Sequence, residues 1–425
     1  MDTMMLIRKQ RMERGFQAMR EQNVDLWIAA GRDLMHKGEP MLNYLLTFEM
    51  GGPVAIILTR DGTSYAINSP METEELESMG LFSKVIANVD GYAGIRDFVA
   101  EKVRELQPQT IALNYSEKDI TSDGLSFTLY RILTEAFQQG GFDGTVCSSQ
   151  NLMKYLRANR SKEEVELIRA AVQESMKIYQ EARPQMHLGM NGMDIQRLFQ
   201  SIADRKGYGY SWPKYGNPFN SIGPRSSYLC KRPADDVYIQ PGDVVNVDFG
   251  IIVNGASSDN QRTFYALRAG ETQPPEEVVR AFNTIGEVNC ALAEHMKAGV
   301  KSGDILKYAN EIFVKNGYPE RNGGFGHEIG YYAHDGVISP GTSRCEPDID
   351  ATFLEGMTFT LEPAILTSFG RVCREEVVVV GKEKGEILST LHQLPTTSPV
   401  WKTKRISRAA LLSAIHWVMP SKMGL

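Results

Sequence analysis

The chain has 425 residues, of which 42% are hydrophobic and 23% are charged, and this length and composition suggest a soluble globular protein of two domains. A formal net charge of −6 argues against a general nucleic-acid-binding or anionic-membrane surface. The five cysteines are scattered and lack CxxC spacing, which argues against a disulfide framework or a zinc ribbon and favours a reducing compartment.

Residues 1–14 are charged and amphipathic, and they lack the continuous apolar core of a secretory signal. No run in the chain approaches the length of a membrane span. We therefore expect a cytoplasmic protein that has no membrane span and no nucleic-acid partner.

The first third of the chain shows helical and strand patterns in turn. Residues 6–22 carry apolar positions at helical spacing, and residues 24–30 have the pattern of a short buried strand. Further strands are expected at 52–58, 64–67, 84–86 and 110–113, and further helices at 94–106 and 124–138. This region has no cluster of His, Cys or acids at ligand spacing. Residues 1–156 are therefore predicted to form a mixed-sheet α/β domain that supports a site built elsewhere.

A second domain is predicted over residues 161–390. It opens with a capping box, in which Ser161 is the N-cap of a long helix and Glu164 reaches back to it. Further helices are expected at 192–205, 275–296 and 301–316, and strands at 242–250, 256–265, 357–361 and 376–380. Helices interspersed with such strands indicate an α+β domain with a largely antiparallel sheet.

Residues 391–425 are predicted to form a basic C-terminal tail. From residue 387 to the end the sequence has no Asp or Glu but contains five Lys and Arg residues. The tail is expected to be a partly ordered extension. As an alternative, the basic amphipathic segment 406–419 could contact an acidic partner or a membrane surface.

The stretch 244–260 is predicted to form a hairpin that carries two acidic residues. The apolar run that leads to Asp248 and the return run that leads to Asp259 are joined through Asn254-Gly255, a pair suited to a tight type I′ turn. Two carboxylates that face each other closely repel unless a cation lies between them. Asp also flanks turns for its own hydrogen-bonding reasons, so the hairpin is either a metal cradle or a pair of surface acids.

Three further residues are candidate metal ligands. His327 lies among glycines that let the backbone approach a bound object, Glu362 ends an apolar strand, and Glu375 begins one. Taken singly, each has an ordinary structural interpretation, but charged groups beside buried strands are costly unless they are paired or metal-bound. Together with the two Asp residues they form an oxygen-rich set suited to two divalent ions, with Mn²⁺ expected and Co²⁺, Zn²⁺ or Fe²⁺ as alternatives. No Cys ligand is present, which argues against a structural zinc site.

The segments VNVDFG, SSDNQRTF, GHEIG, TLEP and REEVVVV carry these residues in an order and spacing that resembles the metallopeptidase family of methionine aminopeptidase, aminopeptidase P and prolidase. The resemblance covers about residues 161–389 and implies the pita-bread fold, an α+β fold with a curved, largely antiparallel sheet. The preceding residues resemble the creatinase-type N-terminal α/β domain of the prolidase and aminopeptidase P branch. The resemblance also implies a homodimer, with the N-terminal domain of one subunit near the site of the other.

The resemblance implies a role for each candidate residue. Five residues would hold two metal ions: Asp248 at one ion, Asp259 and Glu375 bridging both, and His327 and Glu362 completing the second site. The ions would lower the pKa of a water and orient it for attack on a carbonyl. Glu362 would take the proton of that water and deliver it to the leaving nitrogen. His334 would hydrogen-bond the substrate carbonyl and stabilise the tetrahedral intermediate.

The sequence departs from the family pattern at Cys230. Peptidases of this group usually carry a His here, in a segment such as GHxRP, whereas this chain has YLCKRP over residues 228–233. The Arg-Pro that follows, and the QPGD at 240–243, favour a real replacement over a shifted alignment. A thiol can partly replace the imidazole in catalysis, but it is a weaker hydrogen-bond donor with a higher reference pKa.

Two further departures concern the metal ligands. Aminopeptidase P and prolidase often carry an Arg two residues before the last ligand, where this chain has Cys373. Taking Glu376 as the ligand would place Arg374 there, so the last ligand is either Glu375 or Glu376. Lyases of this fold carry an additional Asp two residues after the first ligand, where this chain has Gly250, and this lowers the weight of a lyase interpretation.

Five aromatic residues lie in the segment that faces the pocket in this family: Tyr208, Tyr210, Trp212, Tyr215 and Phe219. They form either a cage for a cation or a prolyl ring, or ordinary packing beneath a loop.

The sequence thus predicts a dinuclear-metal hydrolase of the Xaa-Pro dipeptidase or aminopeptidase type, acting on a short peptide or small amide. The alternative is a non-peptidase enzyme of the same fold, a lyase or a creatinase-like enzyme that cleaves a C–S or C–N bond, because Cys230 replaces the usual His. A third hypothesis, a catalytically silent binding protein, is disfavoured because the set of five ligands is complete.

Overall fold

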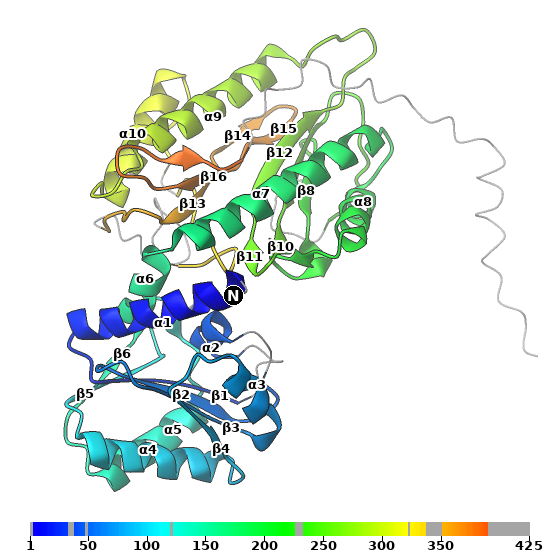
Figure 1. Cartoon of the computed structure of the whole chain (residues 1–425). Coiled ribbons are helices and arrows are strands. Elements are labelled where there is room, and N and C mark those ends of the chain that lie inside the picture. The colour runs from blue at the N-terminus through cyan, green and yellow to red at the C-terminus, as the bar shows by residue number, and fades with distance from the viewer. Residues whose placement is uncertain are drawn as a thin grey trace, which may run out of the picture.

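The computed structural model of the protein describes residues 3–32, 38–46, 50–119, 122–225, 233–321, 324–336 and 351–389. Figure 1 shows two lobes, one built on the sheet of strands β1 to β6 and one that contains the strands from β7 onward.

The first lobe contains, in chain order, α1 (Thr3–Glu21), β1 (Leu26–Gly31), α2 (Pro40–Leu45), β2 (Val54–Thr59), β3 (Ser64–Asn68), α3 (Thr73–Ser78), β4 (Lys84–Ala87), α4 (Tyr92–Leu106), β5 (Thr110–Leu113), α5 (Phe127–Gly140), β6 (Thr145–Ser148) and α6 (Gln150–Ala158). The second lobe contains α7 (Lys162–Ala182), α8 (Gly192–Arg205), β7 (Gly209–Tyr210), β8 (Phe219–Ile222), β9 (Val244–Phe249), β10 (Ile251–Val253), β11 (Ala256–Ser257), β12 (Asn260–Tyr265), α9 (Glu276–His295), α10 (Ser302–Lys315), β13 (Thr358–Leu361), β14 (Ala364–Thr367), β15 (Gly370–Cys373), β16 (Glu376–Val379) and β17 (Glu386–Ile387).

The sheet of the first lobe is mixed, as predicted. Its strand order is β4-β3-β2-β1-β5-β6, with β1 antiparallel to β2 and parallel to β5. Helices α1 and α6 cover one face, where Phe16 and Leu156 pack with Trp27. Helices α4 and α5 cover the other face, where Val99 packs with Ile28. Because both faces are covered, β1 is buried along its whole length and reads as a continuous apolar run.

A buried carboxyl group lies at the start of α2. Glu39 is 1% exposed, and its Oε1 accepts hydrogen bonds from the Met41 amide at 3.0 Å and from the side chain of Asn114. Burial is the main cause that raises the pKa of Glu39 from 4.5 to about 7. Between these two values the folded protein binds a proton that the unfolded chain has released, so this group lowers stability as the pH rises through that window.

We therefore expect Glu39→Gln to remove a pH-dependent loss of stability. Relative to the variant, the wild type should lose roughly 2 to 3 kcal/mol of unfolding free energy between pH 5 and pH 8. Urea unfolding followed by tryptophan fluorescence measures this difference, because buried Trp27 donates to Asn114 Oδ1 at 2.7 Å in the same network. Exposed Glu101 provides the control, since Glu101→Gln should keep the wild-type pH dependence; equal profiles for wild type and Glu39→Gln would refute the prediction.

The second lobe is built from antiparallel ladders between short strands. Its first helix, α7, begins at the predicted capping box, in which Ser161 Oγ accepts from the Glu164 amide and the Ser161 amide donates to Glu164 Oε2 at 2.8 Å. On one side α7 and α8 pack on β9, where the rings of Tyr179, Phe199 and Phe249 meet edge to face. On the other side α9 and α10 pack on β13 to β16. The strands thus lie between two helix pairs (Figure 1).

The predicted strand 256–265 is interrupted, which corrects the expectation of a single return strand. The Asn254-Gly255 turn forms with φ angles of 50° and 76°, as a type I′ turn requires, and it joins β10 to β11. Ser258 then accepts a hydrogen bond from the Ile251 amide at 3.0 Å and closes this small hairpin. After Asp259 the chain steps across to pair as β12 with β9. Asp259 therefore lies at the break rather than inside a strand.

Buried polar contacts join the two lobes. On the first lobe's side, Arg11 and Arg14 of α1 contact the Glu164 carboxylate at 2.7 and 2.6 Å. At a second point the buried carboxylate of Asp335 accepts from Tyr44 Oη and from Arg160 Nη2, both at 2.7 Å. Because Asp335 follows the segment that carries the two candidate histidines, the first lobe is tied directly to that segment.

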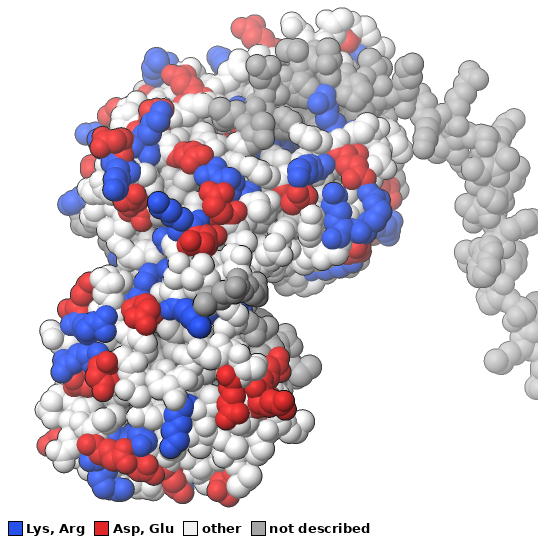
Figure 2. All heavy atoms as spheres, viewed as in Figure 1, with Lys and Arg blue, Asp and Glu red and all other residues white. Residues whose placement is uncertain are grey.

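The domain ranges 1–156, 161–390 and 391–425 stay predictions. The six-stranded sheet lies within the first range, α6 continues past its end to Ala158, and the basic tail lies outside the described residues. Within the described part of the chain, no helix combines the length and apolarity that a membrane crossing requires. On the face shown in Figure 2, Lys and Arg are interspersed with Asp and Glu over both lobes, and a group of acidic side chains lies near α3.

Candidate metal centre

The two acidic residues of the predicted hairpin are brought together by the β9–β12 ladder. Asp248 is the next-to-last residue of β9 and is half-buried, and Asp259 lies immediately before β12 with 5% exposure. The chain can bring them close because the residue after β9 is Gly250. A Cβ there would lie 2.3 Å from the Ser258 carbonyl oxygen and 2.4 Å from the Trp212 ring, so no other residue fits without movement of these groups.

His327 enters the same space from the loop before β13. Its amide donates to Thr360 Oγ1 at 3.1 Å, and a Cβ on the preceding Gly326 would lie 1.8 Å from the Thr360 carbonyl oxygen, so this close approach requires glycine. The ring Nδ1 lies 3.1 Å from the Glu328 carbonyl oxygen. Because a carbonyl only accepts, Nδ1 carries a hydrogen, so in the neutral ring Nε2 has the lone pair that could bind a cation.

The lone-pair nitrogen of His327 faces two carboxylates. Nε2 lies 3.6 Å from Asp259 Oδ2 and 3.7 Å from Glu362 Oε1. Ligand atoms of Asp259, His327 and Glu375 lie within 4.8 Å of one another, and all three residues are buried. The structure therefore brings the predicted residues together from β9, the β11–β12 step, the His327 loop, the end of β13 and the start of β16.

Several oxygens of this cluster have no hydrogen-bond partner among the described residues. They are Asp248 Oδ1, Asp259 Oδ1 and both carboxylate oxygens of Glu375. Burial raises the pKa of Asp248 to about 7, with repulsion from Glu362 adding to it. Burial and neighbouring carboxylates likewise raise the pKa values of Asp259 and Glu375 well above their usual range. Mutually repelling acids with incompletely hydrogen-bonded buried oxygens, beside an imidazole nitrogen, are the donor set that divalent cations bind, so the residues fit a metal site.

The neighbouring Glu376 is already paired. It is fully buried, and its carboxylate contacts Arg262 at 2.9 Å, Arg374 at 2.7 Å and the hydroxyl of Ser389. Glu375, in contrast, faces the cluster. Of the two candidates for the last ligand, only Glu375 has oxygens available to a cation.

The remaining predicted catalytic residues differ in their exposure, and one of them lies outside the described residues. The His334 side chain is exposed, and its ring lies 4.2 Å from that of His327 at an interplanar angle of 54°. Glu362 keeps 28% side-chain exposure, more than the 8% of Asp259. Cys230 lies outside the described residues, so its predicted place in the site stays a prediction.

The five predicted aromatic residues do not form a single cage. The hydroxyls of Tyr208 and Tyr210 donate to Glu174 and Asp204, on helices α7 and α8, at 2.8 and 2.7 Å. Tyr215 is 76% exposed. Trp212 stacks on Phe219 with ring centroids 5.9 Å apart, and Phe219 lies directly opposite Asp248 in the β8–β9 ladder. Only this stacked pair lies beside the candidate ligands.

Two residues that contact the cluster were missed by the sequence analysis. Gln261 Nε2 donates to Glu362 Oε2 at 2.9 Å, and Gln261 Oε1 accepts from Arg371 Nη1 at 2.7 Å. The available sequence signal was its place two residues after Asp259 in the predicted strand 256–265. In the structure, Gln261 reaches the cluster because it lies directly opposite Asp248 in the β9–β12 ladder. Arg371 lies on a short hairpin, β14–β15, that the sequence analysis did not predict.

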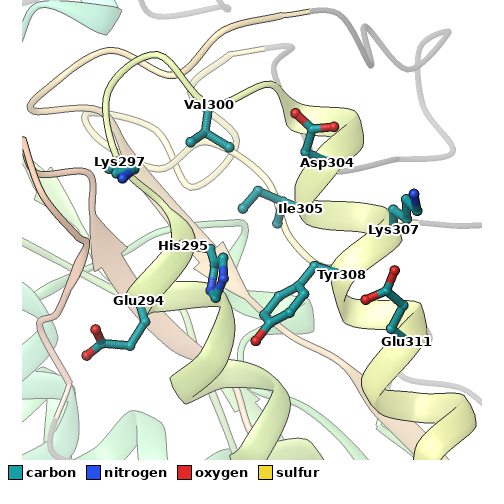
Figure 3. Close-up of a pocket in the computed structure, with 9 residues that line it drawn as sticks. All are labelled: Glu294, His295, Lys297, Val300, Asp304, Ile305, Lys307, Tyr308 and Glu311. Atoms are coloured by element: carbon teal, nitrogen blue, oxygen red, sulfur yellow. The ribbon is translucent and has the colours of Figure 1, made fainter.

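A cavity of about 450 Å³ lies elsewhere in the second lobe, between the end of α9 and α10 (Figure 3). The ring of His295 packs on that of Tyr308, with the ring centroids 3.9 Å apart. Acidic and basic side chains also line the cavity. None of the candidate metal ligands lines this cavity. This cavity is therefore separate from the candidate metal centre, despite its size.

Sequence and structure comparisons agree on one family. The model of Metallopeptidase family M24 matches residues 166–382, just over half of the chain. An uncharacterized peptidase of Staphylococcus haemolyticus is 25% identical over 345 residues, which are 79% of this chain and 87% of the relative. The Xaa-Pro dipeptidase of Pyrococcus furiosus is 25% identical over 265 residues, which are 62% of this chain and 72% of that protein.

Solved structures show the same fold over nearly the whole chain. The X-Pro aminopeptidase of Thermotoga maritima superposes with a TM-score of 0.71 at 23% identity, covering 88% of this chain and 98% of its own. The Xaa-Pro dipeptidase of Bacillus anthracis gives a TM-score of 0.72 at 19% identity, covering 91% and 98%. The predicted α+β class, with a creatinase-type N-terminal domain before a pita-bread domain, is confirmed. The match of the family model shows that this chain belongs to metallopeptidase family M24.

Proposed function

We propose that the protein is a dinuclear-metal hydrolase that cleaves Xaa-Pro dipeptides or other short peptides. The observation that carries the proposal is the set of buried oxygens of Asp248, Asp259 and Glu375 that have no hydrogen-bond partner in the described part of the chain, gathered beside His327. Relatives named as an Xaa-Pro dipeptidase and an X-Pro aminopeptidase support the substrate class.

Five residues would hold the two divalent ions: Asp248, Asp259, His327, Glu362 and Glu375. Mn²⁺ is the ion we expect, with Co²⁺, Zn²⁺ or Fe²⁺ as alternatives, because the set is rich in carboxylates and has one imidazole. When bound, such ions polarise a substrate carbonyl and make a water nucleophilic at neutral pH.

Two side chains of the chain itself are suited to contact the substrate. Glu362 combines contact with the cluster and 28% exposure, so its carboxylate can take a proton from the attacking water and deliver it to the leaving nitrogen. The exposed imidazole of His334 lies beside His327 and can donate a hydrogen bond to the oxygen of the scissile carbonyl, where negative charge develops. In this role it stabilises the transition state more than the substrate.

The proposal predicts that purified protein loaded with Mn²⁺ binds about two equivalents per chain and hydrolyses Xaa-Pro dipeptides. Metal content measured by elemental analysis, together with release of free proline, tests both parts. Chelation should abolish hydrolysis and re-addition of Mn²⁺ should restore it. Binding of less than one equivalent, with no activity restored by Mn²⁺, would refute the two-metal hydrolase.

A non-peptidase enzyme of the same fold is the second candidate, because Cys230 stands where peptidases of this group usually carry His. The lyase form of this alternative is disfavoured by Gly250, since Ser258 and Trp212 leave no room for a ligand side chain there. A creatinase-like enzyme that cleaves a C–N bond stays open. Protein that binds Mn²⁺ but gains Xaa-Pro hydrolysis only after Cys230→His would favour this candidate.

We also propose a cytoplasmic homodimer, on the basis of the family resemblance and the scattered cysteines. Light scattering on the purified protein measures the oligomeric state.

A further inference from the structure

Gln261 connects Arg371 to the proposed acid–base residue, Glu362. It lies on β12 with 2% exposure, directly opposite Asp248 on β9. Its Oε1 accepts a hydrogen bond from Arg371 Nη1 at 2.7 Å, and its Nε2 donates one to Glu362 Oε2 at 2.9 Å. The Gln261 amide therefore links Arg371 on β15 to Glu362, the residue after β13.

The two partners permit a single orientation of this amide. A guanidinium can only donate hydrogen bonds, and an ionised carboxylate can only accept them. With Arg371 on one side and Glu362 on the other, Oε1 must face the arginine and Nε2 must face the carboxylate. The contact with Glu362 already favours this orientation, and Arg371 adds a second, charged contact that holds the Oε1 end of the amide. Without the arginine, the amide loses this contact and is held less firmly against Glu362.

Arg371 is itself held in place. The same Nη1 donates to Asn246 Oδ1 at 3.1 Å, and Asn246 is fully buried on β9. The β14–β15 ladder fixes the backbone of Arg371 opposite Leu366. The arginine is therefore anchored in part by β9, the strand on which Asp248 also lies.

The carboxylate of Glu362 is held at one oxygen by this chain of contacts. Oε2 accepts a hydrogen bond from Gln261 Nε2, and Oε1 points toward His327, whose Nε2 lies 3.7 Å away. The Glu362 side chain is 28% exposed, against 8% for Asp259, so packing restrains it less than it restrains Asp259. We propose that Arg371 is a positioning residue that, through the Gln261 amide, fixes the Glu362 carboxylate with Oε1 toward the cluster. The proposal rests on the proposed function, since it assumes that Glu362 is a ligand and the acid–base group.

A double-mutant cycle tests the proposal. We expect Arg371→Met to weaken Mn²⁺ binding, measured by calorimetry with the metal alone, and to lower kcat for an Xaa-Pro dipeptide, each by about 10- to 100-fold, with KM unchanged. Gln261→Met should do the same. The double variant should be no worse than Gln261→Met alone, because the proposal assigns the effect of the arginine on Glu362 to the amide. Arg371→Lys should recover part of the loss, since an ammonium group also donates to Oε1.

Arg268→Met is the matched control. The Arg268 guanidinium lies over the ring of Phe369, 5.2 Å from its centroid, at the tip of the same hairpin, so this variant perturbs the hairpin without touching Gln261. It should bind Mn²⁺ and turn over like the wild type. Equal loss in Arg268→Met and Arg371→Met would show a general effect of the hairpin and overturn the proposal.

The positioning role of Arg371 and the metal site can be refuted separately. If the wild type binds Mn²⁺ and Arg371→Met binds it equally tightly, or if the losses of the two single variants multiply in the double variant, the positioning role is wrong while the metal site stands. If the wild type binds no divalent metal, the proposed function fails and the positioning role fails with it.

Discussion

Glu375→Gln should abolish tight divalent-metal binding and yet stabilise the metal-free protein. The lost ligand is expected to lower kcat/KM by more than the roughly 100-fold that loss of an outer-shell partner costs. In the metal-free state, burial and neighbouring carboxylates raise the pKa of Glu375 well above its ordinary value of 4.5. The folded state therefore disfavours this charge at neutral pH, and a neutral amide should raise the unfolding free energy by about 1–3 kcal/mol at pH 7.

The adjacent Glu376 offers the matched contrast. Its carboxylate is paired with two buried arginines, Arg262 and Arg374, so Glu376→Gln should lower the unfolding free energy by about 3–5 kcal/mol and leave metal binding in the folded protein. Urea unfolding in the presence of chelator and Mn²⁺ calorimetry measure the two effects. If Glu376→Gln lost the metal and Glu375→Gln kept it, the assignment of the last ligand would be reversed.

Asp335→Ala should be among the most destabilising single substitutions away from the metal site. Its carboxylate is fully buried and pairs with Arg160 at 2.7 Å, and it also accepts from Tyr44. Removing one partner of a buried pair leaves the other charge uncompensated, which costs about 3–5 kcal/mol. Urea unfolding measures the loss, and limited proteolysis of the segment around His334 reports its loosening.

The exposed pair between Arg169 and Glu386, at 2.7 Å, is the control for this prediction. Because a surface ion pair contributes less than about 1 kcal/mol, Glu386→Ala should be nearly neutral. Tyr44→Phe should cost about 1 kcal/mol, since it removes one hydrogen bond and leaves the ion pair. A loss in Asp335→Ala no larger than in Glu386→Ala would show that this contact does not hold the lobes together.

Local sequence signals predicted much of the fold. The capping box at Ser161 and Glu164 located the start of α7, and the Asn254-Gly255 pair located a turn, because in each case the determining contacts lie within a few residues. The apolar runs that became β9, β13 and β16 were also long enough to be recognised. The β14–β15 hairpin was missed, because its strands of four residues are stabilised by ladder pairing and by contacts with distant elements.

The candidate site was predictable as a set of residues but not as a set of contacts. The order of acids and His in the sequence identified Asp248, Asp259 and His327, which the structure brings together. The choice between Glu375 and Glu376 could not be made from spacing, because it depends on buried arginines, one of them more than a hundred residues earlier. The Gln261 to Glu362 contact likewise joins residues that are far apart in the chain.

Gly250 has a consequence for how this centre could evolve. A carboxylate at this position would add a sixth ligand, the fifth acidic one, but its Cβ would overlap the Ser258 carbonyl and the Trp212 ring. A single codon change therefore cannot recruit that ligand, because the backbone of the β11–β12 step and the indole must first move. Descendants of this sequence can more readily acquire new chemistry at the open side of the centre, around His334 and Glu362, than by enlarging the set of buried ligands.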